Sequence, residues 1–221
     1  MLFRSQLLNI LDQFQLDEKV VSAEPFGNGH INDTLKVTNE KGEIKYVLQR
    51  INHLIFTNVD MLQNNIHVVT THIRKKLEEK GETDIDRKVL TFLPTKDGKK
   101  YYFDGDSYWR VCLFIPRSKS YEEVTPELSY EAGKAFGDFQ TMLSDIPEGT
   151  LGETIPDFHN MEFRLRQFHE AVAANPAGRL EEVKDLVEEI EKRAEAMCIQ
   201  ERLYRRSEER RVGKECRSRW S

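Results

Sequence analysis

The chain has 221 residues, of which 38% are hydrophobic and 32% are charged, and its formal net charge is −5. This composition is typical of a folded, soluble protein and excludes a low-complexity chain. The negative charge argues against a nucleic-acid-binding protein. The central apolar run, residues 111–115, is far shorter than the about 20 residues that cross a bilayer, and no signal-peptide pattern opens the chain. We therefore expect a cytoplasmic protein with neither a nucleic acid nor a membrane as a partner.

The cysteines and histidines give no pattern of a metal site or a disulfide framework. The chain has three cysteines, an odd number, and no CxxC pair. The histidines also lack ligand spacing: His67 and His72, for example, point to different sides of any helix. We predict no metal ligands among them.

The first half of the chain alternates strand-like and helical patterns. Apolar residues at helical spacing predict a short amphipathic helix over 2–14. Alternating patterns and short turns predict an antiparallel meander of three strands, at 19–26, 31–38 and 44–51. A long helix is predicted over 58–80, and further strands with Asp-Gly hairpin turns are predicted at 88–93, 100–103 and 107–115.

The second half is helical throughout. Thr125 and Asn160 are predicted caps of helices over 125–143 and 160–174, and a last charged helix is predicted over 180–204. Strands followed by helices indicate an α+β protein. We expect an antiparallel five-stranded sheet with one long helix in residues 1–116, followed by a helical lobe in 117–205.

The segment with most chemical content is Gly27-Asn28-Gly29-His30-Ile31-Asn32-Asp33-Thr34, at the turn between the first two predicted strands. Glycines let the backbone bend and approach a ligand, and N–H groups in such a turn can face phosphate oxygens. A hairpin turn without any ligand is the alternative. The segment is neither a Rossmann fingerprint, because a strand follows it, nor a P-loop, because no Gly-Lys-Ser/Thr follows.

The order of the neighbouring elements favours phosphate binding. In protein kinases a glycine loop precedes a strand with a phosphate-contacting cation, and a helix carrying the partner of that cation follows. Here the strand Tyr46-Val47-Leu48-Gln49-Arg50, the helix over 58–80 and a later strand ending at Pro116 come in the same order. Agreement across several elements counts for more than one motif.

The segments GNGHINDT, YVLQRIN, YWRVCLFI and ETIPDFHN resemble the aminoglycoside phosphotransferase and choline kinase superfamily, which is protein-kinase-like. They are most similar to its branch of bacterial N-acetylhexosamine 1-kinase-type sugar kinases. The resemblance implies a kinase-like N-lobe, followed by the first helices of an incomplete α-helical C-lobe. It also implies a kinase that transfers phosphate from ATP, with Mg²⁺, to a hydroxyl of a sugar or amino sugar.

The resemblance also implies roles for individual residues. Those expected over or beside the ATP phosphates are Gly27, Asn28, Gly29, His30, Asn32 and Thr34. The backbone expected at the adenine edge is that of Leu113, Phe114 and Ile115. The residues expected on the acceptor side are Asp157, Phe158 and His159, for which the alternative is a loop that simply precedes a helix.

The phosphate-contacting residue of the third strand is left open between Gln49 and Arg50. Strand alternation places Gln49 on the face of Val47, which the resemblance makes the adenine side, and turns Arg50 away. The helix residue expected to pair with Gln49 is Asn64. The alternative is that Gln49 and Arg50 are both ordinary strand residues and that neither contacts phosphate.

The sequence lacks the catalytic loop of this superfamily, His-x-Asp-x-x-x-x-Asn, so no catalytic residue is assigned and the Mg²⁺ ligands are expected in a missing C-terminal part. Residues 207–221 read SEERRVGKECRSRWS, with four Arg and one Lys against three Glu. We expect residues 206–221 to be a non-native, vector-like tail on a truncated and inactive kinase. A natural short protein with a basic tail is the alternative to truncation, and a non-catalytic nucleotide- or partner-binding module is the alternative function.

Overall fold

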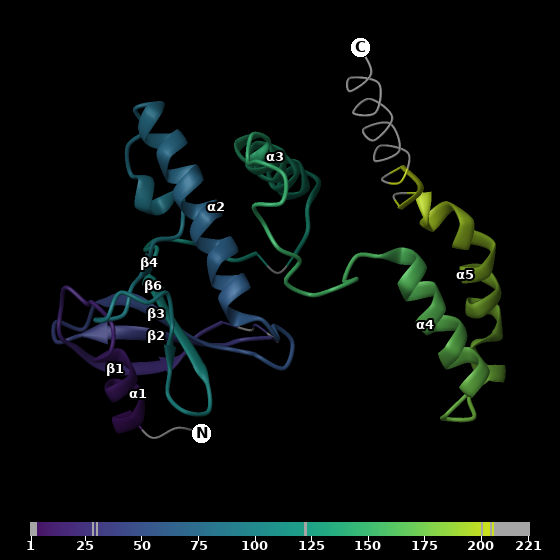
Figure 1. Cartoon of the computed structure of the whole chain (residues 1–221), viewed down its shortest axis with the longest axis horizontal. Coiled ribbons are helices and arrows are strands. Elements are labelled where there is room, and N and C mark those ends of the chain that lie inside the picture. Colours follow the sequence, from purple (N-terminus) through teal and green to yellow (C-terminus); the bar gives the residue numbers. More distant parts are fainter. Residues whose placement is uncertain are drawn as a thin grey trace, which may run out of the picture. The chain divides into compact units, whose positions relative to one another are not determined.

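A computed structural model describes residues 4–27, 29, 31–121, 123–199, 201–203 and 205 (Figure 1). The predicted tail, 206–221, lies outside the described residues. The chain divides into two compact units, Met1–Ile155 and Pro156–Ser221. Its fold class is α+β, as the sequence predicts. The predicted boundary at residue 116 follows the lobes of the resemblance and stays a prediction.

The first unit is built on an antiparallel sheet. Its strands are β1 (Val20–Pro25), β2 (Asp33–Asn39), β3 (Ile44–Ile51), β4 (Phe92–Leu93), β5 (Tyr102–Phe103) and β6 (Tyr108–Leu113). The strand order is β1-β2-β3-β6-β4, and β5, within the strand predicted at 100–103, pairs with β6, so the sheet has six strands where five were expected. The strand predicted over 88–93 shortens to β4, because the Lys88 and Val89 N–H groups donate to the Ile85 carbonyl and continue the turn of the 3-10 helix η1 (Ile85–Arg87).

Three helices accompany the sheet: α1 (Arg4–Leu11), α2 (Val59–Glu79) and α3 (Pro126–Leu143). Local capping accounts for where the last two begin. The side chains of Asn58 and Thr125 accept hydrogen bonds from the N–H groups of Met61 and Leu128. Among the described residues, no helix combines the length and apolar character that crossing a bilayer requires.

The two faces of the sheet differ. On β3, Tyr46 and Leu48 are buried toward α1, where Trp109 of β6 joins the same apolar core. Val47 and Gln49 alternate with them and are only half-buried. On this second face Ile51 packs against the first turns of α2, so α1 and α2 cover opposite faces of the sheet (Figure 1).

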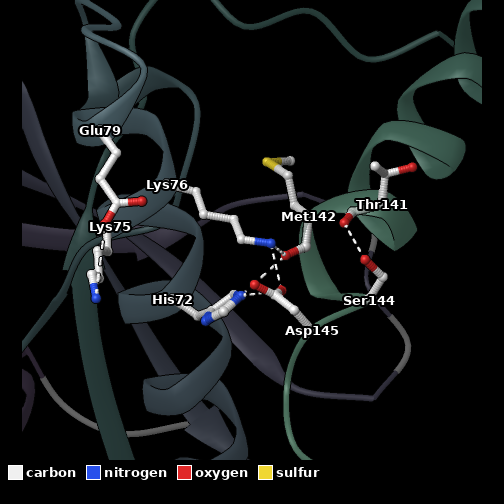
Figure 2. Close-up of polar contacts among 8 residues, drawn as sticks. All are labelled: His72, Lys75, Lys76, Glu79, Thr141, Met142, Ser144 and Asp145. Atoms are coloured by element: carbon white, nitrogen blue, oxygen red, sulfur yellow. Dashed lines mark hydrogen bonds and ion pairs between the residues drawn. The ribbon is translucent and has the colours of Figure 1, made fainter.

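Polar contacts attach the C-terminal half of α2 to the end of α3. Figure 2 shows Asp145, just after α3, between His72 and Lys76 of α2. His72 Nε2 lies 2.9 Å from Asp145 Oδ1, and Lys76 Nζ donates to the Met142 carbonyl at 2.7 Å. The hydrogen bonds from Lys76 and then His72 lower the pKa of Asp145 to about 2.

A second link joins α2 to the loop after α3. Asn65 Nδ2 donates to the Gly152 carbonyl at 2.6 Å, and the Gly152 N–H donates back to Asn65 Oδ1 at 3.0 Å. A Cβ at position 152 would stand 2.5 Å from Met61 Sδ, so only glycine fits without movement. The loop therefore lies directly against α2.

The second unit contains α4 (Met161–Ala174), the 3-10 helix η2 (Leu180–Val183) and α5 (Lys184–Met197). Asn160 caps α4 as predicted, accepting a hydrogen bond from the Phe163 N–H. The continuous helix predicted over 180–204 is instead η2 followed by α5. His169 on α4 lies 2.9 Å from Glu191 on α5.

Candidate functional site

The turn between β1 and β2 has the backbone form that its glycines allow. Gly27 has φ +79°, a left-handed conformation that favours glycine. The Phe26 N–H donates to the Thr34 carbonyl at 2.8 Å, which closes the hairpin below the turn. Asn32 Oδ1 accepts a hydrogen bond from the Asn52 N–H at 3.0 Å, so this predicted site residue ties the turn to the end of β3. Two further predicted residues, Asn28 and His30, lie outside the described residues.

A polar row crosses the α2 face of the sheet beside this turn. Thr34 pairs with Gln49, and Gln49 pairs with Arg110 on β6. Gln49 Nε2 donates to Thr34 Oγ1 at 3.1 Å, and Arg110 Nε donates to Gln49 Oε1 at 3.0 Å. The structure thus brings together two predicted residues and one that the sequence reasoning missed.

Arg110 is half-buried, and its charge is not balanced by a carboxylate among its described contacts. Its Nη1 atom is buried without a hydrogen-bond partner in the described part of the chain. The guanidinium carbon lies 5.3 Å from the centre of the Phe92 ring, which gives a cation–π contact. Burial lowers the pKa of Arg110 and raises that of Cys112, two residues along β6, to about 11. Cys112 is therefore a neutral thiol at pH 7 and supplies no counter-charge.

Arg50 has the opposite placement. It lies on the α1 face, and its Nε donates to Asp33 Oδ2 at 2.7 Å. The predicted separation of faces is confirmed, since Arg50 points away from Thr34 and Gln49. The predicted partner of Gln49 is wrong, because the side-chain oxygen of Asn64 accepts a hydrogen bond from Lys100 Nζ at 3.0 Å.

The predicted adenine-edge residues lie at the end of β6. The Leu113 and Phe114 N–H groups donate to the carbonyls of Thr91 and Lys45, at 2.9 and 2.8 Å, and so are already used by neighbouring segments. The Phe114 ring contacts that of Phe26 edge-on, with centroids 5.9 Å apart. This ring contact joins the end of β6 to the glycine turn. The Ile115 carbonyl accepts a hydrogen bond from the Ser118 hydroxyl at 3.1 Å.

A hollow of about 670 Å³ in the first unit opens on the α1 face. Such a volume suits a small-molecule ligand. Gly27, Gly29, Asn32 and Thr34 border it, together with Arg4 and Arg50, whereas Gln49 and Arg110 do not. Both of these bordering arginines already have acceptors, since Arg4 donates to the Val21 carbonyl and Arg50 to Asp33. The glycine turn therefore borders an alternative ligand site, in which both arginines already donate hydrogen bonds to acceptors of the protein.

The predicted acceptor-side residues lie in the second unit, in the turn before α4. Asp157 has φ +57°, and its Oδ1 accepts a hydrogen bond from Asn160 Nδ2 at 2.8 Å. The Phe158 carbonyl accepts from Arg164 Nε at 3.2 Å, and the His159 ring lies edge-on to the Phe158 ring. These contacts are those of a turn that starts a helix, and the acceptor role stays a prediction.

Within the described ranges, no group of three or more His, Cys, Asp or Glu side chains is placed to hold a metal ion. In a scan against known protein families, no family profile matched the chain.

Proposed function

We propose that the first unit is the ATP-binding part of a phosphotransferase that acts on a hydroxyl of a small molecule such as a sugar or amino sugar. The observation that carries this proposal is the polar row of Thr34, Gln49 and Arg110 beside the glycine turn. ATP is the proposed cofactor, with Mg²⁺ accompanying it.

The order of the strands and helices supports the proposal, because it is the order in which kinases place their ATP-binding elements. A glycine turn joins the first two strands, and the third strand faces a long helix that is inserted before β4. A later strand, β6, lies next to β3 at the centre of the sheet. Kinases bind ATP with a glycine-rich loop, a third-strand residue and a following helix in this order. Because unrelated functions can share one fold, the argument also needs the chemistry of the site.

That chemistry suits a nucleotide. Phosphate groups accept hydrogen bonds and carry negative charge, and the polar row offers hydroxyl, amide and guanidinium donors on one face. Gly27 permits a close backbone approach at the turn that begins beside Thr34. Phe26 and Phe114 offer ring faces and edges against which a planar base could pack.

The test is thermal unfolding of the whole chain in the presence of Mg-ATP, with MgCl2 alone as the control. A ligand present at roughly 100 times its Kd stabilises the folded state by roughly 2.7 kcal/mol, so a saturable rise in Tm is expected. Gly27→Ala should weaken this response, because the left-handed backbone at φ +79° is strained for alanine. No rise at millimolar Mg-ATP would contradict the proposal.

A second candidate is a non-catalytic module that binds a nucleotide or another partner, and the hollow on the α1 face favours it. The sequence contains no His-x-Asp-x-x-x-x-Asn loop, so the proposal for this chain itself is binding without turnover. Both candidates predict that this chain releases no ADP with amino sugars as acceptors, so the face on which the ligand binds separates them. Turnover would rule out the non-catalytic module, and binding lost on Arg50→Met but not on Arg110→Met would place the ligand on the α1 face.

A further inference from the structure

Arg110 differs from other cations of the first unit in what surrounds it. Arg74 is paired with Asp86, Lys76 with Asp145 and Arg50 with Asp33. The Arg110 Nη1 atom is buried, yet the described contacts of the Arg110 side chain are the Gln49 amide and the Phe92 ring. Burying a charge without a counter-charge is costly, and folded proteins usually pair such a group. The structure therefore leaves an uncompensated positive charge on the α2 face.

A second donor near Phe92 also lacks an acceptor. The Gln63 side chain on α2 is 3% exposed, and its Nε2 atom has no partner in the described part of the chain. Gln63 and Phe92 border the same hollow, of about 430 Å³, between α2 and β4. Arg110 does not border this hollow, but its guanidinium carbon lies 5.3 Å from the centre of the same Phe92 ring. Unsatisfied donors and a positive charge in one region are complementary to an anion.

The position of Arg110 in the sheet indicates which kind of anion would bind beside it. Kinases place a phosphate-contacting cation on the third strand, where this chain has the neutral Gln49. Arg110 is the cross-strand neighbour of Gln49, and its Nε lies 3.0 Å from Gln49 Oε1. The guanidinium group therefore lies at the tip of the Gln49 side chain, in the cross-strand row that also contains Thr34.

We propose that Arg110 is the phosphate-binding cation of this site, supplied by β6 in place of the third strand, and that Gln49 is a positioning residue that holds its guanidinium. The identity of the anion as the phosphates of a nucleotide rests on the proposed function. A guanidinium fork suits two phosphate oxygens at once, and Arg110 Nη1 is a buried donor that has no acceptor within the described structure.

The test compares Arg110→Met with Arg50→Met in the full chain, by titration calorimetry. The two arginines are on neighbouring strands and opposite faces, so they form a matched pair. The probes are inorganic tripolyphosphate, Mg-ATP and adenosine. Arg110→Met should weaken tripolyphosphate and Mg-ATP at least about tenfold and leave adenosine unchanged, because only a charged hydrogen bond is lost. Arg50→Met should leave all three affinities within about twofold, because the Arg50 side chain is 44% exposed and already paired with Asp33.

The outcomes separate this inference from the proposed function. If Mg-ATP binds equally well to wild type and Arg110→Met, the inference is overturned and the nucleotide site remains. If tripolyphosphate binding depends on Arg110 while Mg-ATP and adenosine do not bind, the anion site is supported and the nucleotide function fails. If no probe binds to the wild-type chain, both are overturned.

Two further measurements exclude a purely structural role for Arg110. Methionine of similar volume in place of an unpaired buried charge should leave Tm unchanged or raise it, whereas a structural role predicts a lower Tm. Gln49→Lys added to Arg110→Met should restore at least part of the tripolyphosphate affinity, since it returns a cation to the same face. Failure of this rescue argues against the site. Should Arg110→Met not fold, Arg110→Gln is judged by the same criteria.

Discussion

The two faces of the sheet use adjacent residues of the same strands for different purposes. On the α1 face Leu48, Trp109 and Val111 are at most 1% exposed and form one apolar core. On the α2 face their immediate neighbours Gln49 and Arg110 form a polar row that is only half-buried. Side chains alternate along a strand, so one step in sequence moves from one environment to the other. Mutations one residue apart should therefore affect different properties: those on the α1 face should lower stability, and those on the α2 face should weaken ligand binding.

The largest effect is expected on the α1 face. Trp109→Ala removes a side chain that is 1% exposed and whose Nε1 donates to Asp104 Oδ2 at 2.7 Å. Loss of such a side chain costs about 3–5 kcal/mol of unfolding free energy. Denaturant unfolding measures this, with Arg110→Met as the neighbouring control. A loss below about 1 kcal/mol would show that the α1 face does not hold the core.

The next effect tests how α2, which covers the polar face, is held in place. Gly152→Ala puts a Cβ 2.5 Å from Met61 Sδ and 2.7 Å from its Cγ, so the Met61 side chain must change its conformation or the loop must shift. Overpacking of this kind costs about 1–3 kcal/mol, and urea unfolding should show it. Gly133→Ala is the control: within α3 it meets no atom within 4 Å, so it should stabilise by up to about 1 kcal/mol. Equal effects at both positions would contradict the close packing of the loop on α2.

A pH-dependent effect tests the same attachment. The pKa of Asp145 is lowered to about 2 by Lys76 and His72. A lowered pKa contributes stability that is complete above the unfolded value of about 4 and is lost as pH falls through the folded value. Tm should therefore fall between pH 4 and pH 2, and Asp145→Asn should reduce this fall. Asp138→Asn on α3 is the control, and an identical pH profile for wild type and Asp145→Asn would contradict the contact.

The smallest effect on stability is expected for the ion pair between Arg50 and Asp33 on the α1 face. Arg50 and Asp33 have side chains that are 44% and 60% exposed. Exposed pairs contribute about 0–1 kcal/mol, so Arg50→Ala should change the unfolding free energy by less than about 1 kcal/mol. A loss above about 2 kcal/mol in urea unfolding would mean that Arg50 belongs to the core of that face.

The sequence correctly predicts those features of the fold that depend on interactions between residues close together in the chain. The helices that start at Asn58, Thr125 and Asn160 are confirmed, because a capping side chain acts within three residues of itself. Alternation on β3 likewise predicts the opposite faces of Gln49 and Arg50. These features need no knowledge of distant parts of the chain.

The contacts that the sequence does not predict depend on how distant segments of the chain pair and pack. Arg110 joins Gln49 through the register of two strands that lie far apart in sequence, and its only local sign is an arginine within the apolar run of YWRVCLFI. The expected contact of Asn64 is wrong because one residue turns a helix by about 100°: Gln63, not Asn64, is the buried amide of α2. The link from Asp145 to α2 likewise depends on how two helices pack.

The central claim is that the α2 face of the sheet holds the phosphates of a nucleotide. The most direct measurement is the affinity of Mg-ATP for wild type, Arg110→Met and Arg50→Met by titration calorimetry. The account predicts at least about tenfold weaker binding for Arg110→Met and wild-type affinity for Arg50→Met. Weaker binding for Arg50→Met with no change for Arg110→Met would contradict the account and place the ligand in the hollow on the α1 face.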